Sequence, residues 1–186
     1  MENDITSRIV SPENAVQHQG AKILVYGMAG AGKTYLSQTA PGKVLVISAE
    51  AGLLSIRDAK NVEAIEVKNA AEVVEVYEAL RSGRLQYDTV CLDSISEISE
   101  LLLQAEKAKH KDARKAYGEV QESVTNVMRA FRDLQMHVMF ICKEDKVNND
   151  GVFEQAPKMV GTKLGQSITY FFDEVLALRV IEDADA

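Results

Sequence analysis

Near its N-terminus the chain reads Gly27-Met28-Ala29-Gly30-Ala31-Gly32-Lys33-Thr34. This stretch fits every fixed position of the pattern G-x-x-x-x-G-K-[ST], in which a glycine-rich loop binds phosphate groups. Residues 23–26 before it are apolar and predict a buried strand, and residues 34–40 after it are compatible with a helix. A strand, a loop and a helix in this order are the context that the motif requires, so a chance glycine-rich turn is a poor alternative.

The residue types of this loop explain what it can do. Glycines allow backbone angles and close approaches that side chains block, so backbone amides can converge on phosphate oxygens at the start of a helix. Lys33 supplies a mobile cation for the terminal phosphates, which places it among the catalytic residues, and Thr34 offers a hydroxyl to Mg²⁺. We therefore predict a site for ATP and Mg²⁺, formed by the loop and by the next residue, Tyr35.

The composition is that of an ordinary globular protein. The chain has 186 residues, of which 46% are hydrophobic, and a formal net charge of −7. This charge argues against a surface that is basic throughout and binds duplex DNA, but not against a local basic site. Cys91 and Cys142 lie in apolar runs and predict buried, reduced thiols. We see no signal peptide and no bilayer-spanning run, so we expect no membrane association and take the cytoplasm as the default compartment.

The order of apolar and polar segments divides the chain into three parts. Residues 1–20 form a polar N-terminal arm, either a flexible leader or a segment that joins a neighbouring subunit. Residues 21–181 form one domain, and residues 182–186 form an acidic tail. Within the domain we expect strands at 23–26, 43–48, 62–67, 87–93, 137–142 and 174–180, and helices near 70–81, from 95 onward and at 117–134. This alternation predicts a three-layer α/β/α fold with a mainly parallel sheet and the nucleotide at the carboxyl ends of its strands.

Two carboxylates follow or end predicted strands. Glu50 comes just after the strand at 43–48 and is a candidate base for activating water; the alternative is an ordinary surface carboxylate. Asp93 ends an apolar strand and is a candidate Mg²⁺ ligand together with Thr34; the alternative is a helix cap. Ring-forming ATPases of the AAA+ type usually carry their catalytic Glu directly after this Asp, but here the residue is Ser94. Glu97 is therefore the second candidate for the base.

Two polar segments are candidates for binding single-stranded DNA. The first is a basic run that contains Lys107, Lys109, Lys111, Arg114 and Lys115. It suits contact with a phosphate backbone, although a solvated loop or helix end is the usual meaning of such a run. The second is residues 143–167, which predict a long polar loop, functional or disordered. Phe153 has no core to fill there and could stack on a base.

Taken together, these segments resemble the RecA-type ATPase core. Residues 46–50 resemble that family's strand ending in the glutamate that activates water, and residues 90–94 resemble its Mg²⁺-site strand. Residues 140–143 resemble the strand that ends in a γ-phosphate-sensing polar residue, normally Gln and here Lys143, which the resemblance implies is catalytic. Arg57 lies where the family places an aromatic residue over adenine, so its guanidinium is expected to stack there. The family's two DNA-binding loops fall on the basic run and on residues 143–167, the latter with Phe153, Lys158 and Lys163.

Within that superfamily the chain is similar to a group of bacteriophage nucleotide-binding proteins, short RecA-like recombinases of the single-strand-annealing type. The segments that carry this likeness are residues 113–118, 130–134 and 165–174, and the likeness extends over about residues 20–180. It implies single-stranded DNA as a partner, a homo-oligomer that is a ring or a filament, and a bacterial host's cytoplasm as the location. It also suggests a phage single-strand DNA-binding protein as a collaborator.

The leading expectation is a Mg²⁺-dependent ATPase that binds single-stranded DNA and promotes annealing or recombination. A small-molecule phosphotransferase is the first alternative, although residues 143–167 lack the arginines that nucleotide kinases usually carry in their lids. The second alternative is a DNA-binding module that uses ATP only as a structural ligand and does not hydrolyse it.

Overall fold

The computed structural model describes residues 5–16, 19–50, 52–109, 113–149 and 151–181. The acidic tail and Lys111 therefore lie outside the described residues, as do the side chains of Arg114, Lys115 and Lys163. None of the helices in the described part of the chain is both long enough and apolar enough to span a bilayer.

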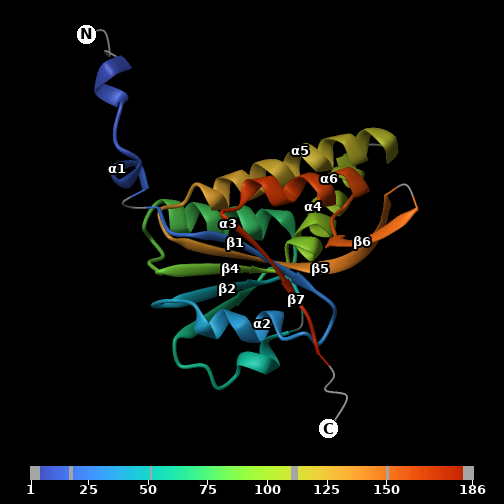
Figure 1. Cartoon of the computed structure of the whole chain (residues 1–186), viewed down its shortest axis with the longest axis horizontal. Helices are drawn as coiled ribbons and strands as arrows, with labels where there is room; N and C mark the ends of the chain where they lie inside the picture. The colour runs from blue at the N-terminus through green and yellow to red at the C-terminus, as the bar shows by residue number, and fades with distance from the viewer. Residues whose placement is uncertain (1–4, 17–18, 51, 110–112, 150, 182–186) are drawn as a thin grey trace.

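A twisted sheet of seven strands forms the centre of the described fold (Figure 1). Its parallel strands, in the order in which they lie across the sheet, are β3 (Val62–Glu66), β2 (Val44–Ser48), β4 (Thr89–Asp93), β5 (His137–Asn149), β1 (Lys22–Gly27) and β7 (Glu174–Leu178). The remaining strand, β6 (Val152–Pro157), pairs antiparallel with the second half of β5. The prediction of an α/β fold with a mainly parallel sheet is confirmed.

Helices cover both faces of this sheet, but unequally (Figure 1). One face carries α3 (Ala70–Arg81), α4 (Ile95–Lys109), α5 (Ala113–Arg132), α6 (Thr162–Ser167) and the 3-10 turn η4 (Ile168–Phe171). The other face carries α2 (Lys33–Leu36) and the 3-10 turns η2 (Ser37–Thr39) and η3 (Leu53–Ile56). The helix expected after the phosphate loop is thus one short α-helix followed by a 3-10 turn.

The central strands have apolar residues on both sides because each face of the sheet has its own core. Leu24 and Phe140 pack with the α3–α5 layer, whereas their neighbours Val25 and Ile141 pack with the thinner layer. All four side chains are fully buried. Strands buried on both faces read as continuous apolar runs, which is why the sequence identified them.

The register of the parallel strands decides where the site lies. Gly27 at the end of β1 is opposite Lys143 on β5, and Ser48 at the end of β2 is opposite Asp93 at the end of β4. The carboxyl ends of β1, β2 and β4 and the end of the parallel part of β5 therefore meet at one edge of the sheet, where the segments that follow them can build a common pocket.

The prediction of a long loop over residues 143–167 is wrong. Strand β5 continues through Asn149 and turns into β6, and α6 follows. The turn contains Gly151, which has φ of +90°, and its amide donates to Asn148 Oδ1 at 2.8 Å. Most side chains of the hairpin are exposed on both faces, so the strands lack the alternation of apolar and polar residues that marks a half-buried strand. The Asp-Gly pair at 150–151 was the signal available for this hairpin.

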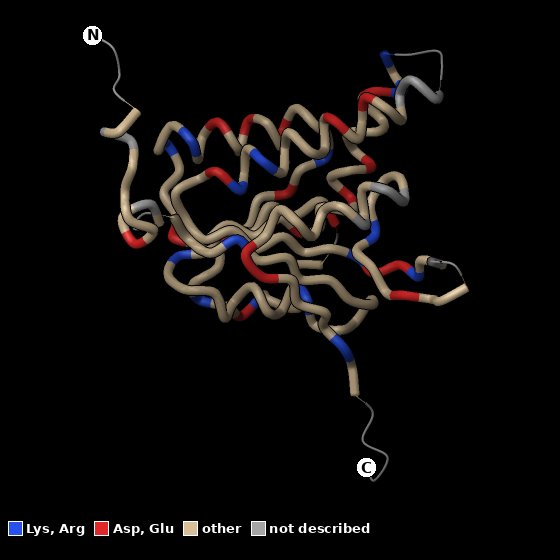
Figure 2. The backbone as a smooth tube through the Cα atoms, turned by 45° about the horizontal axis from the view of Figure 1, so that its top comes forward, with Lys and Arg blue, Asp and Glu red and all other residues tan. Residues whose placement is uncertain are grey.

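The N-terminal arm forms two short helical segments, η1 (Ile5–Arg8) and α1 (Pro12–Val16), which extend away from the sheet in Figure 1. Ile9 and Val10 between them are exposed. Elsewhere acidic and basic residues are interspersed along the backbone, as Figure 2 shows.

Candidate functional site

The phosphate loop connects β1 to α2 at the shared carboxyl edge of the sheet. Gly30 and Gly32 have φ of +77° and +87°, angles that favour glycine, and open space surrounds both. Gly27 is needed for a different reason. A Cβ there would lie 2.5 Å from the carbonyl oxygen of Leu178, so glycine is what allows β7 to pair beside the loop.

The two polar side chains of the loop have defined partners. The Lys33 ammonium donates to the carbonyl oxygens of Gly27 at 2.9 Å and Met28 at 2.7 Å, so it folds back over its own loop. The Thr34 hydroxyl donates to Asp93 Oδ2 at 2.5 Å. The loop and the end of β4 are therefore joined through the two side chains predicted to hold Mg²⁺.

Asp93 is buried, with 6% of the residue exposed. Burial, with a smaller contribution from the charge of Glu50, raises the pKa of this carboxyl despite the opposing hydrogen bond from Thr34. The described residues hold no cluster of three or more His, Cys, Asp or Glu side chains suited to a metal. Mg²⁺ does not need one, because it keeps several waters and is bound by one or two carboxylates plus substrate phosphates. The hydroxyl and carboxylate oxygens of Thr34 and Asp93 fit that requirement.

Asp93→Asn is expected to stabilise the nucleotide-free protein and to abolish Mg²⁺-dependent nucleotide binding. Because the pKa of Asp93 is raised in the folded chain, the folded state binds this proton more tightly than the unfolded state. The free energy of unfolding therefore falls as the pH rises from the ordinary carboxyl range through the raised pKa, and asparagine removes this loss. Thermal unfolding at acidic and neutral pH checks the sign: the Tm of the variant should exceed that of the wild type by more at neutral pH. A Tm difference between variant and wild type that does not change with pH would contradict a raised pKa of Asp93 in the folded protein.

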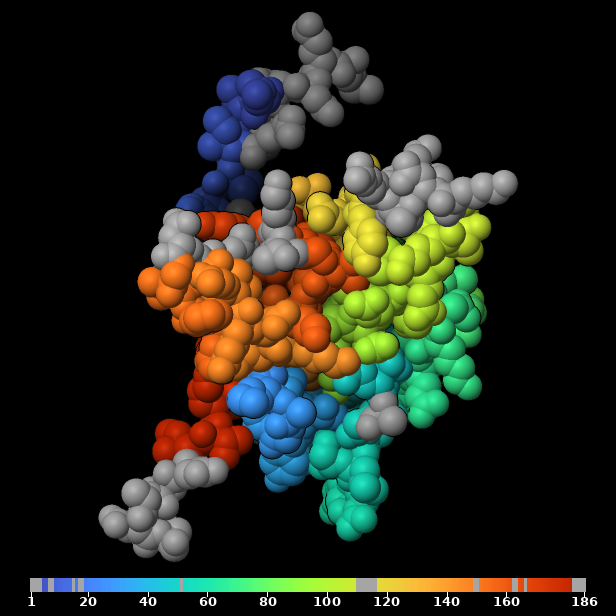
Figure 3. Space-filling model, turned by 90° about the vertical axis from the view of Figure 1, so that its right-hand side faces the viewer, coloured from blue at the N-terminus to red at the C-terminus, as the bar shows by residue number. Residues whose placement is uncertain are grey.

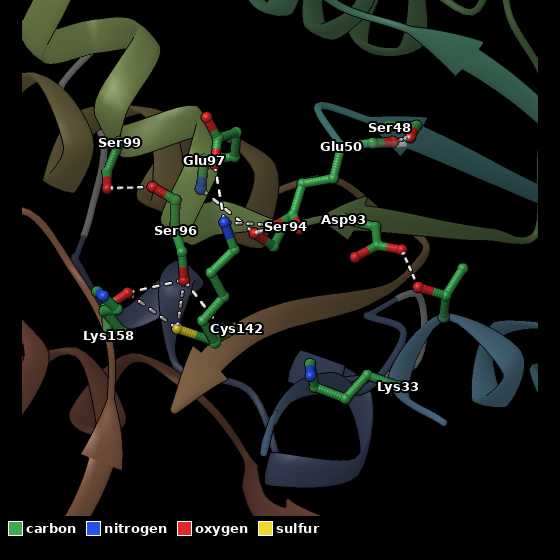
Figure 4. Close-up of polar contacts among 12 residues, drawn as sticks. Lys33, Ser48, Glu50, Asp93, Ser94, Ser96, Glu97, Ser99, Cys142 and Lys158 are labelled. Atoms are coloured by element: carbon green, nitrogen blue, oxygen red, sulfur yellow. Dashed lines mark hydrogen bonds and ion pairs between the residues drawn. The ribbon is translucent and has the colours of Figure 1, made fainter. Parts of the chain in front are cut away.

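A second group of charged side chains lies beside this pair (Figure 4). Glu50 follows β2, and its Oε1 accepts a hydrogen bond from the Ser94 hydroxyl. The same Oε1 lies 3.4 Å from Lys143 Nζ, which also donates to Glu97 Oε2 at 2.8 Å. Burial by itself lowers the pKa of Lys143, but the hydrogen bond to Glu97 and the charges of Glu50 and Glu97 outweigh it and raise that pKa. Both candidate bases are thus bound to one ammonium group.

Buried serines on the first turns of α4 connect this group to the hairpin. Ser96 Oγ donates to the carbonyl oxygen of Lys158 at 2.7 Å and accepts from the amide of Lys143 at 2.9 Å. The amide of Lys158 in turn donates to the carbonyl oxygen of Lys143 at 2.7 Å. The sulfur of Cys142 lies 3.2 Å from Ser96 Oγ, and burial raises the pKa of the Cys142 thiol to about 12. Cys91 and Cys142 are both free and buried, which confirms the prediction of buried thiols.

The phosphate loop, Glu50, Asp93 and Lys143 border a cavity of about 490 Å³, whereas Glu97 lies outside its lining. The cavity is lined by Gly27, Met28, Ala29, Gly30, Gly32, Lys33, Thr34, Tyr35, Glu50, Ser55, Asp93, Ser94, Lys143, Glu144 and Lys158. Figure 3 looks onto this edge of the molecule. The hairpin (orange) lies next to the phosphate loop and α2 (both light blue), and η3 (teal) lies beside them. Residues predicted from four separate segments of the sequence therefore share one cavity.

Some predicted residues lie elsewhere. Ala31 is in the loop but not in the cavity lining. Arg57 is also outside the lining; its guanidinium pairs with Asp58 at 3.2 Å and its side chain is 69% exposed, so its position does not support the expected stacking on a base. Lys158, expected on a DNA-binding loop, lines the cavity because β6 returns the chain to the end of the parallel part of β5.

Sequence reasoning missed Ser55, Ser94 and Glu144 as lining residues. Only Ser94 had a local signal, its place directly after Asp93. Glu144 pairs with Arg179, which follows β7, and this contact depends on strand pairing.

The predicted DNA-binding residues are only partly described. Lys107 and Lys109 are in the last turn of α4, where Lys107 lies over the Tyr117 ring at 5.5 Å and Lys109 pairs with Glu106 at 2.9 Å. Phe153 is near the tip of the hairpin, with 71% of the residue exposed. The end of α4 and the hairpin lie toward the same end of the molecule in Figure 1.

One comparison with known proteins gives a match over nearly the whole chain. A family model described as an AAA domain matches residues 19–184. No curated protein matched the chain. Among solved structures, the KaiC-like protein PH0186 from the hyperthermophilic archaeon Pyrococcus horikoshii OT3 aligns over 74% of this chain and 77% of its own, with 12% identity and a TM-score of 0.43. A likeness of this size does not bear on function, and the similarity to the bacteriophage recombinase group stays a prediction. Because the family model spans nearly the whole chain and the cavity is built on a phosphate loop, the protein belongs to the AAA domain family of P-loop ATPases.

Proposed function

We propose that this protein binds ATP with Mg²⁺ and hydrolyses it, with Glu50 as the base that activates water. One observation carries the proposal: Glu50, from the loop after β2, lines the same cavity as Lys33, Thr34 and Asp93. These residues come from three strand ends, so a carboxylate, a cation and a pair of Mg²⁺-suited oxygens converge on one space. This set of groups is what hydrolysis of a phosphoanhydride needs.

The loop amides and Lys33 would hold the phosphates, once the Lys33 ammonium leaves the two carbonyl oxygens that it contacts in the free protein. Thr34 and Asp93 would hold Mg²⁺, which when bound neutralises charge on the phosphate oxygens. Glu50 takes a proton from water as the water oxygen bonds to the γ-phosphorus. The bond from that phosphorus to the bridging oxygen breaks, and its electron pair stays with ADP. Tyr35, which lines the cavity and is 57% exposed, is available to contact the adenine ring of ATP.

Release of inorganic phosphate from ATP, with and without Mg²⁺, tests this function. Phosphate release that requires Mg²⁺ is expected. A phosphotransferase would instead form ADP without free phosphate, and only when a small-molecule acceptor is present. Tight ATP binding with no phosphate release and no ADP would favour the module that uses ATP as a structural ligand.

The second part of the proposal is that the β5–β6 hairpin binds single-stranded DNA and that an oligomer uses it for annealing or recombination. Val152 and Phe153 are 61% and 71% exposed near the hairpin tip, and an exposed aromatic ring is suited to stacking on a base. The root of the hairpin lines the cavity through Lys143 and Lys158, so DNA bound at the tip would sit on the same element as the ATP site. The basic residues Lys107 and Lys109 would contact phosphates beside it.

Phe153→Ala is expected to weaken binding of a labelled single-stranded oligonucleotide by about 5- to 150-fold, the equivalent of ~1–3 kcal/mol for one stacked base. Fluorescence anisotropy at a fixed salt concentration measures it. Tyr170→Ala is the matched control, because Tyr170 is an aromatic residue that is 90% exposed in η4. Equal affinities for Phe153→Ala and wild type would remove the hairpin from the DNA site.

A further inference from the structure

The ammonium of Lys143 lies between the two candidate bases. It donates to Glu97 Oε2 at 2.8 Å and lies 3.4 Å from Glu50 Oε1. The side chains of Lys143, Glu50 and Glu97 are 40%, 33% and 34% exposed, so the group is not locked in the core. Lys143 and Glu50 line the cavity, whereas Glu97 lies outside its lining. One cation is thus shared by two carboxylates at unequal distances.

This arrangement restrains Glu50 as a base. The oxygen that faces Lys143 is the same one that accepts the hydrogen bond from Ser94. A carboxylate oxygen that already accepts a hydrogen bond from a hydroxyl and faces an ammonium has fewer lone pairs free to accept one from a water molecule, and its side chain is held in one position. Glu97 acts in the opposite direction, because it draws the same ammonium away from Glu50.

Lys143 is also fixed to the hairpin. It is the last residue of β5 to pair with β1, and the next residue, Glu144, is the first to pair with β6. Its backbone amide donates to Ser96 Oγ, and its carbonyl oxygen accepts from the amide of Lys158. The backbone that carries the ammonium is therefore held by the parallel sheet, by α4 and by the first residues after β6 at once.

We infer that Lys143 is a positioning residue that restrains Glu50 in the resting protein, and that Glu97 competes with Glu50 for its ammonium. This inference rests on the proposed hydrolysis by Glu50 and adds its regulation. It assigns to Lys143 an inhibitory effect, the opposite of what a γ-phosphate-sensing residue would have.

The experiment compares kcat for ATP hydrolysis in three variants at saturating Mg²⁺ and ATP. Lys143→Met should raise kcat by about two- to fivefold, the rate equivalent of one partly exposed ion pair. Glu97→Gln should lower kcat by about twofold, because the ammonium then turns to Glu50. The double variant should match Lys143→Met, since Glu97 acts only through Lys143. Lys146→Met, on the same strand and exposed, is the matched control and should leave kcat unchanged.

Opposite effects of the single substitutions, with the dissociation constant for a non-hydrolysable ATP analogue unchanged, would support the inference. A fall in kcat for Lys143→Met that Lys143→Arg restores would overturn it, because Lys143 would then act directly on the phosphate. A loss of about a hundredfold or more in Glu97→Gln that persists in the double variant would overturn it too, and would make Glu97 the base.

A measurement without ATP separates this inference from the proposed function. If Lys143 and Glu50 form an ion pair in the resting protein, the Tm shifts of Lys143→Met and Glu50→Gln should not add in the double variant. Additive shifts would overturn the inference even if wild-type protein hydrolyses ATP. Non-additive shifts in a protein that releases no phosphate would leave the ion pair established and refute the proposed function alone.

Discussion

Glu50→Ala lowers the rate of ATP hydrolysis by about 100- to 10,000-fold and leaves ATP binding intact, if Glu50 is the general base. Its carboxylate lines the cavity but belongs to the loop after β2, whereas the proposed phosphate contacts come from the loop after β1. Truncating it removes the proton acceptor and none of the groups that hold the triphosphate. Phosphate release under single-turnover conditions measures the first effect, and binding of a fluorescent ATP analogue measures the second.

Glu66→Ala is the matched control for this substitution. Glu66 ends β3, the strand beside β2, and it lies outside the cavity lining, so its removal should change neither rate nor affinity. Normal hydrolysis by Glu50→Ala would refute the mechanism. In that case Glu97→Ala becomes the decisive variant, because Glu97 is the other carboxylate bound to Lys143.

Lys33→Ala is expected to weaken binding of a non-hydrolysable ATP analogue by about 10- to 150-fold, the equivalent of ~1.5–3 kcal/mol for hydrogen bonds to a charged group. In the free protein this ammonium contacts only carbonyl oxygens of its own loop among the described contacts, so its loss should leave the fold intact. Isothermal titration with the analogue and Mg²⁺ measures the dissociation constant.

Lys60→Ala, which removes an exposed lysine from the segment between η3 and β3, controls for the change in net charge. An affinity equal to that of the wild type in Lys33→Ala would show that the triphosphate does not occupy the phosphate loop. Annealing of DNA strands that persists in Lys33→Ala would favour a DNA-binding module that does not depend on ATP.

The site is predictable from the sequence where chemistry depends on neighbours along the chain. The spacing from Gly27 to Thr34 identifies the phosphate loop, since the backbone angles and the helix start that bind phosphate are local properties. Glu50 and Asp93 could be placed at strand ends, and parallel strands put their carboxyl ends at one edge of a sheet. The structure brings both into the cavity with Lys33 and Thr34.

The hairpin and its root were not predictable in the same way. Most of β6 is exposed, so the continuous apolar run that identifies β1 or β4 is missing from it. Lys158 reaches the cavity because β6 reverses the chain beside β5, and Arg57 does not reach it because η3 directs that residue to solvent. Both outcomes depend on where a chain reversal points, which the residue types do not specify.

The sequence by itself determined the α/β class, the phosphate loop and the two strand-end carboxylates, because each depends on a local pattern of burial or backbone angle. Only the tertiary structure decided that Glu50 and Glu97 share the ammonium of Lys143 and that this ammonium sits at the root of a hairpin. Lys143 is separated along the chain from Glu97 by 46 positions and from Glu50 by 93 positions. Strand register and the packing of α4 against β5 set the distances between these charged groups. The strength of their electrostatic interaction depends on those distances.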